Sequence, residues 1–365
     1  MRRLRVALIA PPWYPLPPHG YGGTELVVHL LGRELRALGH DVRIFGAEGS
    51  GPGVDQVAPA AWAGDLGGPN ARMREAAYLR RVFKRIQSEH FDVIHDHSGP
   101  VGTLLALESH RSNVVVHTIH SALEEPELDF YRELGEKVVL VAISQAQAAA
   151  ASSLPINAVI HNAVDVSALD FRSRKEGYLV ELARVCPAKG QHLAIALARR
   201  LNRKLIIAGK VEPGAEGQRY FENYIEPQLG SQVEYWCNVA GREKAELLAR
   251  AAAGVFPLQW PEPFGLALVE TMASGTPVLA IGNGAAHELV EPGVTGFVGK
   301  TIEDLVEDFQ RLGEIDPVRC ASVARRRFSP RRMAEGYVGA YGGIAAADRV
   351  QASHASGQIP AVPAS

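Results

Sequence analysis

Short apolar runs recur along the chain and alternate with longer segments in which apolar residues follow the spacing of an amphipathic helix. The clearest of these helices are predicted at Thr24–Leu38, Ala71–Glu89 and Gln145–Ser152. The strands do not alternate apolar with polar residues, so we expect parallel sheets covered by helices on both faces. In the first half of the chain the strands are predicted at 4–10, 41–45, 92–95, 113–119, 137–143 and 157–161.

The same alternation starts again in the second half of the chain. The predicted strand-and-helix units are too many for one doubly wound sheet, and 365 residues are enough for two hydrophobic cores. We therefore predict an α/β fold with two Rossmann-like, doubly wound parallel-sheet domains that face a central cleft. The strands of the second half are predicted at 177–183, 204–209, 232–236, 253–258, 277–281 and 295–299.

The boundary between the domains is predicted in the charged segment 165–176, which separates a first domain at 1–168 from a second at 169–328. An amphipathic C-terminal helix follows at 329–348. The remaining tail, 349–365, has no aromatic residue, and we expect it to be disordered.

Composition excludes several classes of function. The net charge is −2 and the pI is near 6.7, which argues against a nucleic-acid partner bound by bulk electrostatics. The cysteines Cys186, Cys237 and Cys320 are widely spaced and form neither a disulfide framework nor a zinc-ligand pattern.

The N-terminal segment is basic and then apolar, but its apolar run, residues 6–10, is too short for a signal peptide and predicts a buried first strand. No apolar run approaches the about 20 residues of a membrane-spanning helix. We therefore expect a cytoplasmic protein without an integral membrane segment. Peripheral contact with a membrane stays open.

A pair of glutamates, Glu262 and Glu270, stands on either side of a Pro-Phe-Gly turn in the sequence EPFGLALVE. A helix is predicted to begin after Gly265, and its N-terminal N–H groups would favour a phosphate there. Gly265 has no side chain, so a ligand can approach the backbone closely. Two glutamates at this spacing also occur on solvated helix surfaces, so the rest of the chain has to decide between these readings.

A glycine-rich loop, GYGG at 20–23, follows the first predicted strand and precedes a helix. Its N–H groups could hold an anion or a sugar hydroxyl. The loop does not match G-x-G-x-x-G and is too long for a dinucleotide turn, which disfavours a nicotinamide dehydrogenase. The alternative is a flexible loop in which Thr24 caps the helix.

Arg184 and Lys189 follow the first strand of the second domain, beside a predicted cleft. A guanidinium and an ammonium at a strand end can together hold a diphosphate. The alternative is a solvated loop with two cations.

Histidines follow three of the predicted strands, and His120 comes just after its strand at the edge expected to face the cleft. It could hydrogen-bond a sugar hydroxyl, or it could be a satisfied core residue. The pair His95 and His97 has the spacing of metal ligands, but the zinc-ligand residues that would complete a site are absent nearby. Five aromatic residues could stack on a ligand ring or pack internally, namely Trp13, Tyr14, Trp62, Phe130 and Tyr131.

With these motifs in view, the chain resembles the retaining nucleotide-sugar glycosyltransferases of family 4, which have the GT-B fold. The resemblance extends from the first strand to about residue 345 and is strongest at EPFGLALVETMASGTPVLA with GAAHELVEPGVTGFVG. Supporting pieces are GYGGTE, LARVCPAKG, VAISQ, VIHNAVD and LIIAGK. The C-terminal helix at 329–348 is then expected to cross back onto the first domain.

The resemblance implies that the second domain holds the donor. Glu270 would bind the ribose hydroxyls of the nucleotide, and Glu262 would contact hydroxyls of the donor sugar. The backbone around Phe264, Gly265 and Leu266 would lie close to the sugar and the phosphates.

The same resemblance implies which groups act on the transferred sugar. Arg184 and Lys189 would hold the diphosphate, and His120 would lie near the transferred sugar. The catalytic groups implied in this way are His120, Arg184, Lys189 and Glu262.

Further positions would bind the donor through their backbone or a small side chain. Gly22 and Gly23 would line the first-domain loop near the phosphates and the acceptor. Gly209 and Val239 match positions that lie beside the nucleotide.

The expected reaction is transfer of a glycosyl group from a UDP- or GDP-sugar to the hydroxyl of a small-molecule or glycan acceptor, with retention of configuration. No metal or other cofactor is expected, since the cations and the helix N-terminus supply positive charge. Two other enzyme classes stay open. These are a sugar-nucleotide epimerase of the same fold and a glycoside hydrolase that uses Glu262 and Glu270 as an acid/base pair. A binding protein that has lost catalysis is disfavoured by the intact charged groups.

Overall fold

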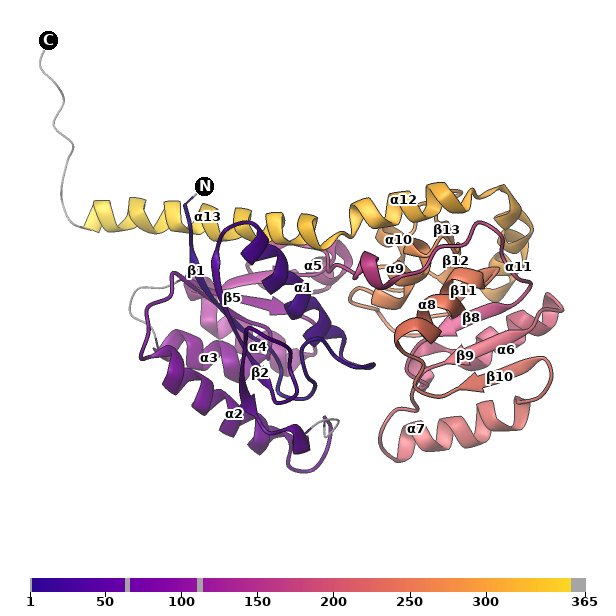
Figure 1. Cartoon of the computed structure of the whole chain (residues 1–365), viewed down its shortest axis with the longest axis horizontal. Helices are drawn as coiled ribbons and strands as arrows, with labels where there is room; N and C mark the ends of the chain where they lie inside the picture. Colours follow the sequence, from indigo (N-terminus) through magenta and orange to yellow (C-terminus); the bar gives the residue numbers. More distant parts are fainter. Residues whose placement is uncertain (1, 63–65, 110–113, 356–365) are drawn as a thin grey trace, which may run out of the picture.

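A computed structural model describes residues 2–62, 66–109 and 114–355 and shows two α/β domains that lie side by side (Figure 1). Each domain contains one parallel sheet with helices on both faces. The predicted fold class of two doubly wound domains is therefore confirmed. Among the described helices, none is both long enough and apolar enough to cross a membrane.

The first domain is built on a seven-stranded sheet in the order β3-β2-β1-β4-β5-β6-β7, and all its strand pairs are parallel. The edge strand β3 is not predicted from the sequence, because it is only partly buried and contains Asp55 and Gln56. The predicted strand 113–119 begins at a residue outside the described ranges. The strands are β1 Arg5–Ile9, β2 Asp41–Ala47, β3 Val54–Ala58, β4 Val93–Asp96, β5 Val114–Ile119, β6 Val139–Ala142 and β7 Ile156–Val159.

Helices cover both faces of this sheet because apolar side chains project from both. On one face Val6 and Leu8 pack against α1 and the C-terminal helix α13. On the other face Ala7 and Ile9 pack in a core that contains α2 and Tyr131 of α4. The helices before the domain boundary are α1 Gly23–Ala37, α2 Ala71–Ile86, α3 Pro100–Ser109, α4 Glu125–Leu134 and α5 Gln145–Ala150.

The second domain has a six-stranded parallel sheet in the order β10-β9-β8-β11-β12-β13. Its strands are β8 Leu179–Leu182, β9 Leu205–Ala208, β10 Val233–Trp236, β11 Ala253–Phe256, β12 Val278–Ile281 and β13 Gly296–Gly299. Its helices are α6 Gln191–Arg200, α7 Ala215–Tyr220, α8 Gly241–Arg250, α9 Leu266–Ala273, α10 Ala286–Leu289, α11 Ile302–Arg311 and α12 Pro317–Arg327. A π-turn at Phe221–Ile225 extends α7.

In both sheets the chain reverses its direction of winding next to the first strand of the domain, between β1 and β4 and between β8 and β11. Ligands of doubly wound folds bind outside the carboxyl ends of the strands at such points. The loop at 10–22 and the segment at 183–190 follow β1 and β8, so the topology places both at the expected binding edge.

The long helix α13, Pro330–Ala355, returns from the second domain and crosses the first (Figure 1). Met333, Tyr337 and Tyr341 are buried in the core that also contains α1. The helix continues beyond residue 348, where the sequence analysis expected disorder to begin. Alanine, the strongest helix former, is frequent up to Ala355, which fits this extension. The rest of the predicted tail, 356–365, lies outside the described residues.

Candidate functional site

A cavity of about 390 Å³ lies between the two domains, at the carboxyl ends of their strands. The structure brings together in its walls every site residue predicted from the sequence. These residues are Gly22, Gly23, His120, Arg184, Lys189, Gly209, Val239, Glu262, Phe264, Gly265, Leu266 and Glu270. We call this cavity the donor cleft, after the donor that the sequence predicts for it.

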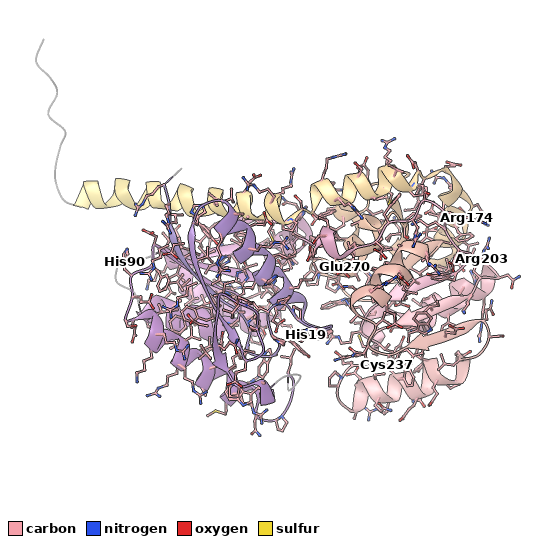
Figure 2. All side chains as sticks on the ribbon, in the orientation of Figure 1. His19, His90, Arg174, Arg203, Cys237 and Glu270 are labelled. Atoms are coloured by element: carbon pink, nitrogen blue, oxygen red, sulfur yellow. The ribbon has the colours of Figure 1, made fainter. Side chains whose placement is uncertain are left out.

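The glycine-rich loop before α1 extends from the first domain to the second. His19 marks this loop in Figure 2, where it lies beside the region between the domains. A side chain at Gly20 would contact Asn238, and one at Gly23 would press on Leu266, both of the second domain. Small residues in this loop therefore let the first domain close over the cleft without filling it.

The N-terminus of α9 forms the floor of the cleft. Gly265 precedes the helix with a φ of 105°, a left-handed conformation that glycine adopts without strain. The first N–H groups of a helix have no intrahelical partner and carry positive dipole character. Leu266 is the first residue of α9, so these N–H groups face a cavity lined by Gly265 and Leu266. The arrangement suits an anion.

Glu262 is held from two sides. Lys189 Nζ contacts Glu262 Oε2, and the indole N–H of Trp260 donates to the same oxygen at 2.8 Å. The Lys189 ammonium also lies 4.8 Å from the centre of the Trp260 ring. The sequence analysis did not single out Trp260, because nothing in the sequence shows that its ring turns into the cleft.

Glu270 lies deeper and is paired with a second lysine. Its side chain is mostly buried on α9, and Lys244 Nζ on α8 donates to Glu270 Oε1 at 2.7 Å. Lys244 is a further residue that the sequence analysis missed. Its neighbours in the sequence have ordinary surface-helix chemistry, and only the packing of α8 beside α9 brings it to the cleft.

Arg184 extends from the loop after β8 and pairs with Glu212 at 2.6 Å. Lys210 lines the same end of the cleft. Among the described residues it makes no ion pair or side-chain hydrogen bond, unlike the other cations of the cleft. The two cations that the sequence predicts for a diphosphate therefore both line the cleft, and each is neutralised by a protein carboxylate.

Gly209 follows β9 where the ends of β8 and β9 are closest. Its φ is 150°, and a Cβ there would lie 1.9 Å from the carbonyl oxygen of Ala183. Only glycine fits this approach, so this end of the cleft has a wall of backbone without side chains. Val239, the other predicted neighbour of the nucleotide, lies almost buried in the same region.

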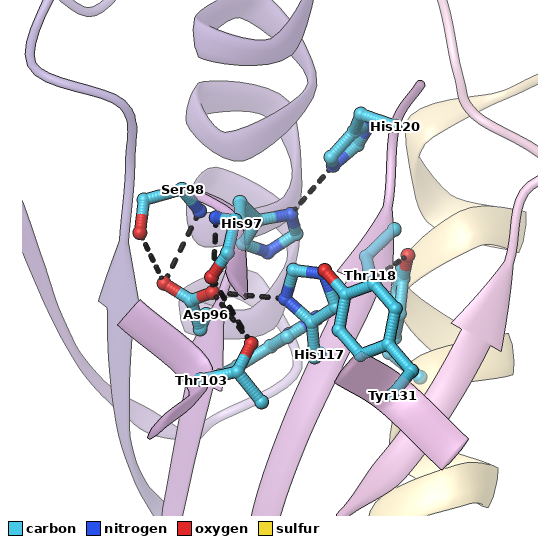
Figure 3. Close-up of polar contacts among 11 residues, drawn as sticks. Asp96, His97, Ser98, Thr103, His117, Thr118, His120 and Tyr131 are labelled. Carbon is cyan, nitrogen blue, oxygen red and sulfur yellow. Dashed lines mark hydrogen bonds and ion pairs between the residues drawn. The ribbon is translucent and has the colours of Figure 1, made fainter. Parts of the chain in front are cut away.

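His120 enters the cleft from the end of β5 in the first domain. Its Nε2 lies 2.9 Å from His97 Nδ1, so one of the two rings donates to the other (Figure 3). Burial lowers the pKa of His120 to about 3, and the nearby His117 acts in the same direction. The imidazole is therefore neutral at pH 7 and can exchange hydrogen bonds with a ligand without adding charge.

A buried polar network supports this histidine pair (Figure 3). Asp96 accepts hydrogen bonds from Ser98 and Thr103, and its Oδ2 lies 2.8 Å from His117 Nδ1. His117 Nε2 lies 2.7 Å from the hydroxyl of Tyr131. These buried groups satisfy one another's hydrogen bonds.

The remaining histidine of the H-x-H pair bonds to the C-terminal helix. His95 Nδ1 lies 2.7 Å from the hydroxyl of Tyr341, and His95 Nε2 lies 2.8 Å from Thr118 Oγ1. The hydroxyl of Tyr337 lies 2.9 Å from Thr118 Oγ1 and completes this series of hydrogen bonds. His95 is therefore a buried core residue, and hydroxyl groups engage both of its ring nitrogens.

Two family models match the chain in succession. The model described as Glycosyltransferase Family 4 covers residues 21–168, and the model described as Glycosyl transferases group 1 covers residues 170–326. The chain belongs to this family of glycosyltransferases. The predicted family is thereby confirmed.

Known proteins agree with this assignment. A phosphatidyl-myo-inositol mannosyltransferase of Mycolicibacterium smegmatis is 27% identical over 323 residues, which are 80% of this chain and 80% of the relative. A glycogen synthase of Mycobacterium tuberculosis is 25% identical over 347 residues, 80% of this chain and 81% of the relative. The solved structure of AviGT4, a glycosyltransferase involved in avilamycin A biosynthesis, has a TM-score of 0.74 at 28% identity, covering 94% of this chain and 98% of that one.

A more distant structure shares the fold. Anabaena HepE in complex with UDP-glucose has a TM-score of 0.71 at 18% identity and covers 93% of this chain and 100% of its own. The two-domain GT-B architecture expected from the resemblance is thus confirmed.

The structure shows which of the five aromatic residues singled out from the sequence pack internally and which line a cavity. Trp13 and Tyr131 are buried, so they pack internally. Trp62 and Phe130 pack against the core beneath α2 and α4. Tyr14 is half-buried and lines a second cavity beside the donor cleft.

Glu25, in the first turn of α1, is a buried group that the sequence analysis missed. A side chain at the neighbouring Gly22 would lie 3.3 Å from its carboxyl. Burial raises the pKa of Glu25 to about 7. The carboxyl beside the glycine-rich loop is therefore only partly ionised at neutral pH.

Proposed function

We propose that this glycosyltransferase moves a glycosyl group from a UDP- or GDP-sugar to an acceptor hydroxyl with retention of configuration. One observation carries the proposal: the anion site at the N-terminus of α9 lies between Glu262 and Glu270, each held by a lysine. A sugar joined to a nucleoside by a diphosphate has hydroxyls at both ends and charge in the middle. It therefore complements this arrangement.

The donor would lie along the cleft with its ribose at Glu270 and its sugar at Glu262. The diphosphate would lie at Gly265, within reach of Arg184 and Lys189. Gly209 and Val239 would then border the base. Support for a nucleotide sugar also comes from Anabaena HepE, whose structure contains UDP-glucose.

The chemical difficulty is the negative charge that grows on the leaving diphosphate. Arg184, Lys189 and the α9 N-terminus lie beside the proposed position of the diphosphate, and positive groups that the protein holds there would stabilise that charge in the transition state. Binding the diphosphate would draw Arg184 away from Glu212 and Lys189 away from Glu262. Glu262 would then be free to accept hydrogen bonds from the sugar.

Retention follows if the acceptor attacks from the face that the diphosphate leaves. A phosphate oxygen of the leaving group would take the acceptor proton, so no enzymatic nucleophile is needed. His120 would hydrogen-bond the transferred sugar as a neutral imidazole. We propose that no metal ion takes part, because the protein's own cations neutralise the diphosphate.

Replacement of one diphosphate cation tests the proposal. Lys189→Ala is expected to lower turnover of UDP-glucose or GDP-mannose about 100-fold, the usual effect of losing one preorganised donor. The assay measures release of UDP or GDP with a mixture of methyl glycosides as acceptors. Mass spectrometry identifies the product, and the assay is repeated in excess EDTA with no expected loss of rate.

Lys204→Ala is the matched control. Lys204 also pairs with a glutamate, Glu234, but the pair is half-exposed and lies outside the cleft. Normal turnover in Lys189→Ala, or equal losses in both variants, would contradict the proposed role of Lys189. Loss of activity in EDTA would contradict the metal-free mechanism.

A further inference from the structure

A second cavity of about 420 Å³ opens beside the donor cleft, and the two share Tyr21, Arg184 and Lys210. Tyr14 and Leu66 form part of its wall without lining the donor cleft. Cavities of this size hold small ligands. The shared Arg184 puts such a ligand next to the proposed diphosphate.

Two tyrosines form a corner of this second cavity. The rings of Tyr14 and Tyr21 lie 5.5 Å apart with an angle of 70° between their planes. Each ring offers an apolar face, and each has a hydroxyl that can exchange hydrogen bonds. A ring with one apolar face and several hydroxyls, as in a glycosyl unit, complements such a corner.

Where the two cavities meet, the positive groups outnumber the negative ones. Arg184 is paired with Glu212, which also lines the second cavity. Lys210 lines both cavities, and within the described ranges its ammonium has no carboxylate partner. The junction therefore has one positive charge in excess.

Donor binding would change this balance. A diphosphate that engages Arg184 removes the partner of Glu212, whose carboxylate then needs other hydrogen-bond donors. Glu212 and Lys210 together would leave the second cavity with one charge of each sign. Such a cavity favours an uncharged ligand with several hydroxyls over an anion or a cation.

We propose that the second cavity is the acceptor subsite and that it takes an uncharged, polyhydroxylated ring such as a glycosyl unit. Tyr14 and Tyr21 stack on the ring, and Glu212 and Lys210 bind its hydroxyls. The inference rests on the proposed function, because it needs a donor in the adjoining cleft. Since Glu212 is released from Arg184 by the diphosphate, the acceptor binds after the donor.

Filling the cavity tests the inference. Leu66 is half-exposed and lines only the second cavity, so Leu66→Trp adds bulk there without disturbing a core. Met73 on α2 is exposed and lines neither cavity, so Met73→Trp is the matched control. The probe is methyl α-D-glucopyranoside, and its binding is followed by saturation-transfer NMR with and without UDP or GDP at saturation.

The wild-type protein and Met73→Trp are expected to bind the glycoside only when the nucleoside diphosphate is present. In Leu66→Trp glycoside binding falls about tenfold or more, while the affinity for UDP or GDP, measured by calorimetry, is unchanged. Unchanged glycoside binding in Leu66→Trp overturns the inference, as does the absence of glycoside binding in the wild-type protein with nucleotide bound.

Two further outcomes separate the inference from the proposed function. If the wild-type protein binds neither UDP nor GDP, the proposed function is wrong. If glucose 6-phosphate binds about tenfold more tightly than the methyl glycoside, the cavity selects an anion. The assignment of an uncharged acceptor is then overturned while the donor site stands.

Discussion

At the scale of single residues, the contacts around Glu262 explain why a lysine and a glutamate can share the cleft. Lys189 neutralises Glu262, and Trp260 donates to the oxygen that Lys189 contacts. The Trp260 ring also lies against the ammonium, a favourable arrangement for a cation. Trp260 thus holds both charged groups in place.

Trp260→Phe tests this positioning role. The substitution keeps a ring beside Lys189 and removes the N–H that orients Glu262. We expect kcat with UDP-glucose or GDP-mannose to fall about tenfold, the loss expected from one hydrogen bond to a charged group. The affinity for UDP or GDP alone should stay near the wild-type value, since neither contains the sugar that Glu262 would bind.

Trp236→Phe is the control for that variant. The Trp236 indole also donates to a glutamate two residues away, Glu234, at 3.1 Å, but Trp236 does not line the donor cleft. Its removal should leave kcat unchanged. A loss of nucleotide affinity as large as the loss of kcat in Trp260→Phe would show that the tryptophan holds the cleft together and does not act through Glu262.

At the scale of secondary-structure elements, α13 joins the two halves of the protein. It leaves the second domain after Phe328, whose carbonyl accepts a hydrogen bond from Val164 N at 3.2 Å, where the chain first crosses. It then buries Tyr337 and Tyr341 in the first domain. Both tyrosines reach β4 and β5, the strands that also position His97 and His120.

Tyr341→Phe is expected to lower the free energy of unfolding by about 1–3 kcal/mol, because His95 Nδ1 loses its buried partner. Urea denaturation measures the change. Tyr224→Phe, at an exposed position, should change stability by less than about 0.5 kcal/mol. Equal stability of Tyr341→Phe and the wild-type protein would show that water or another group satisfies His95.

At the scale of the whole molecule, buried titratable groups in the first domain make stability depend on pH with opposite signs. The pKa of His120 is lowered to about 3, so its contribution is fully present above about pH 6.5 and is lost as pH falls toward 3. The pKa of Glu25 is raised to about 7, so its contribution is fully present below about pH 4.5 and is lost as pH rises through 7. Stability should therefore fall on both sides of a slightly acidic optimum.

Glu25→Gln isolates the alkaline side of this dependence. The variant has no carboxyl to ionise, so its stability relative to the wild-type protein should rise by about 3 kcal/mol between pH 4.5 and pH 8. Urea denaturation at both pH values measures the difference. Glu307→Gln, at an exposed site, should show no such change. If the free energy of unfolding of Glu25→Gln differs from that of the wild-type protein by the same amount at both pH values, ionisation of a buried Glu25 is contradicted.

Much of the fold could be predicted because parallel strands that are buried on both faces are continuously apolar. The edge strand β3 was missed for the same reason, since its exposed half carries polar residues. The site residues of the sequence prediction all line the donor cleft, because motifs such as EPFGLALVE are local and their glycines and charges are visible in the sequence. Their roles in binding the donor are still predictions.

Trp260, Lys244, Lys210 and Glu25 could not be found in this way. Each is an ordinary residue in its local sequence and becomes notable only through a neighbour far along the chain or through burial. Lys244 on α8 is notable only because it pairs with Glu270 on α9. Lys210 is notable because Arg184, Lys189 and Lys244 each have a carboxylate partner, whereas Lys210 has none within the part of the chain that the structure describes.

The sequence by itself determined the two doubly wound domains, the helix N-terminus at Gly265 and the charged residues around it, because apolar patterning and turn chemistry act over short distances. Only the tertiary structure decided which carboxylate neutralises which cation. It also decided that α13 completes the first domain and that a second cavity joins the cleft at Lys210. These features depend on contacts between distant segments, and the free energy of such contacts depends on burial and distance that no local pattern records.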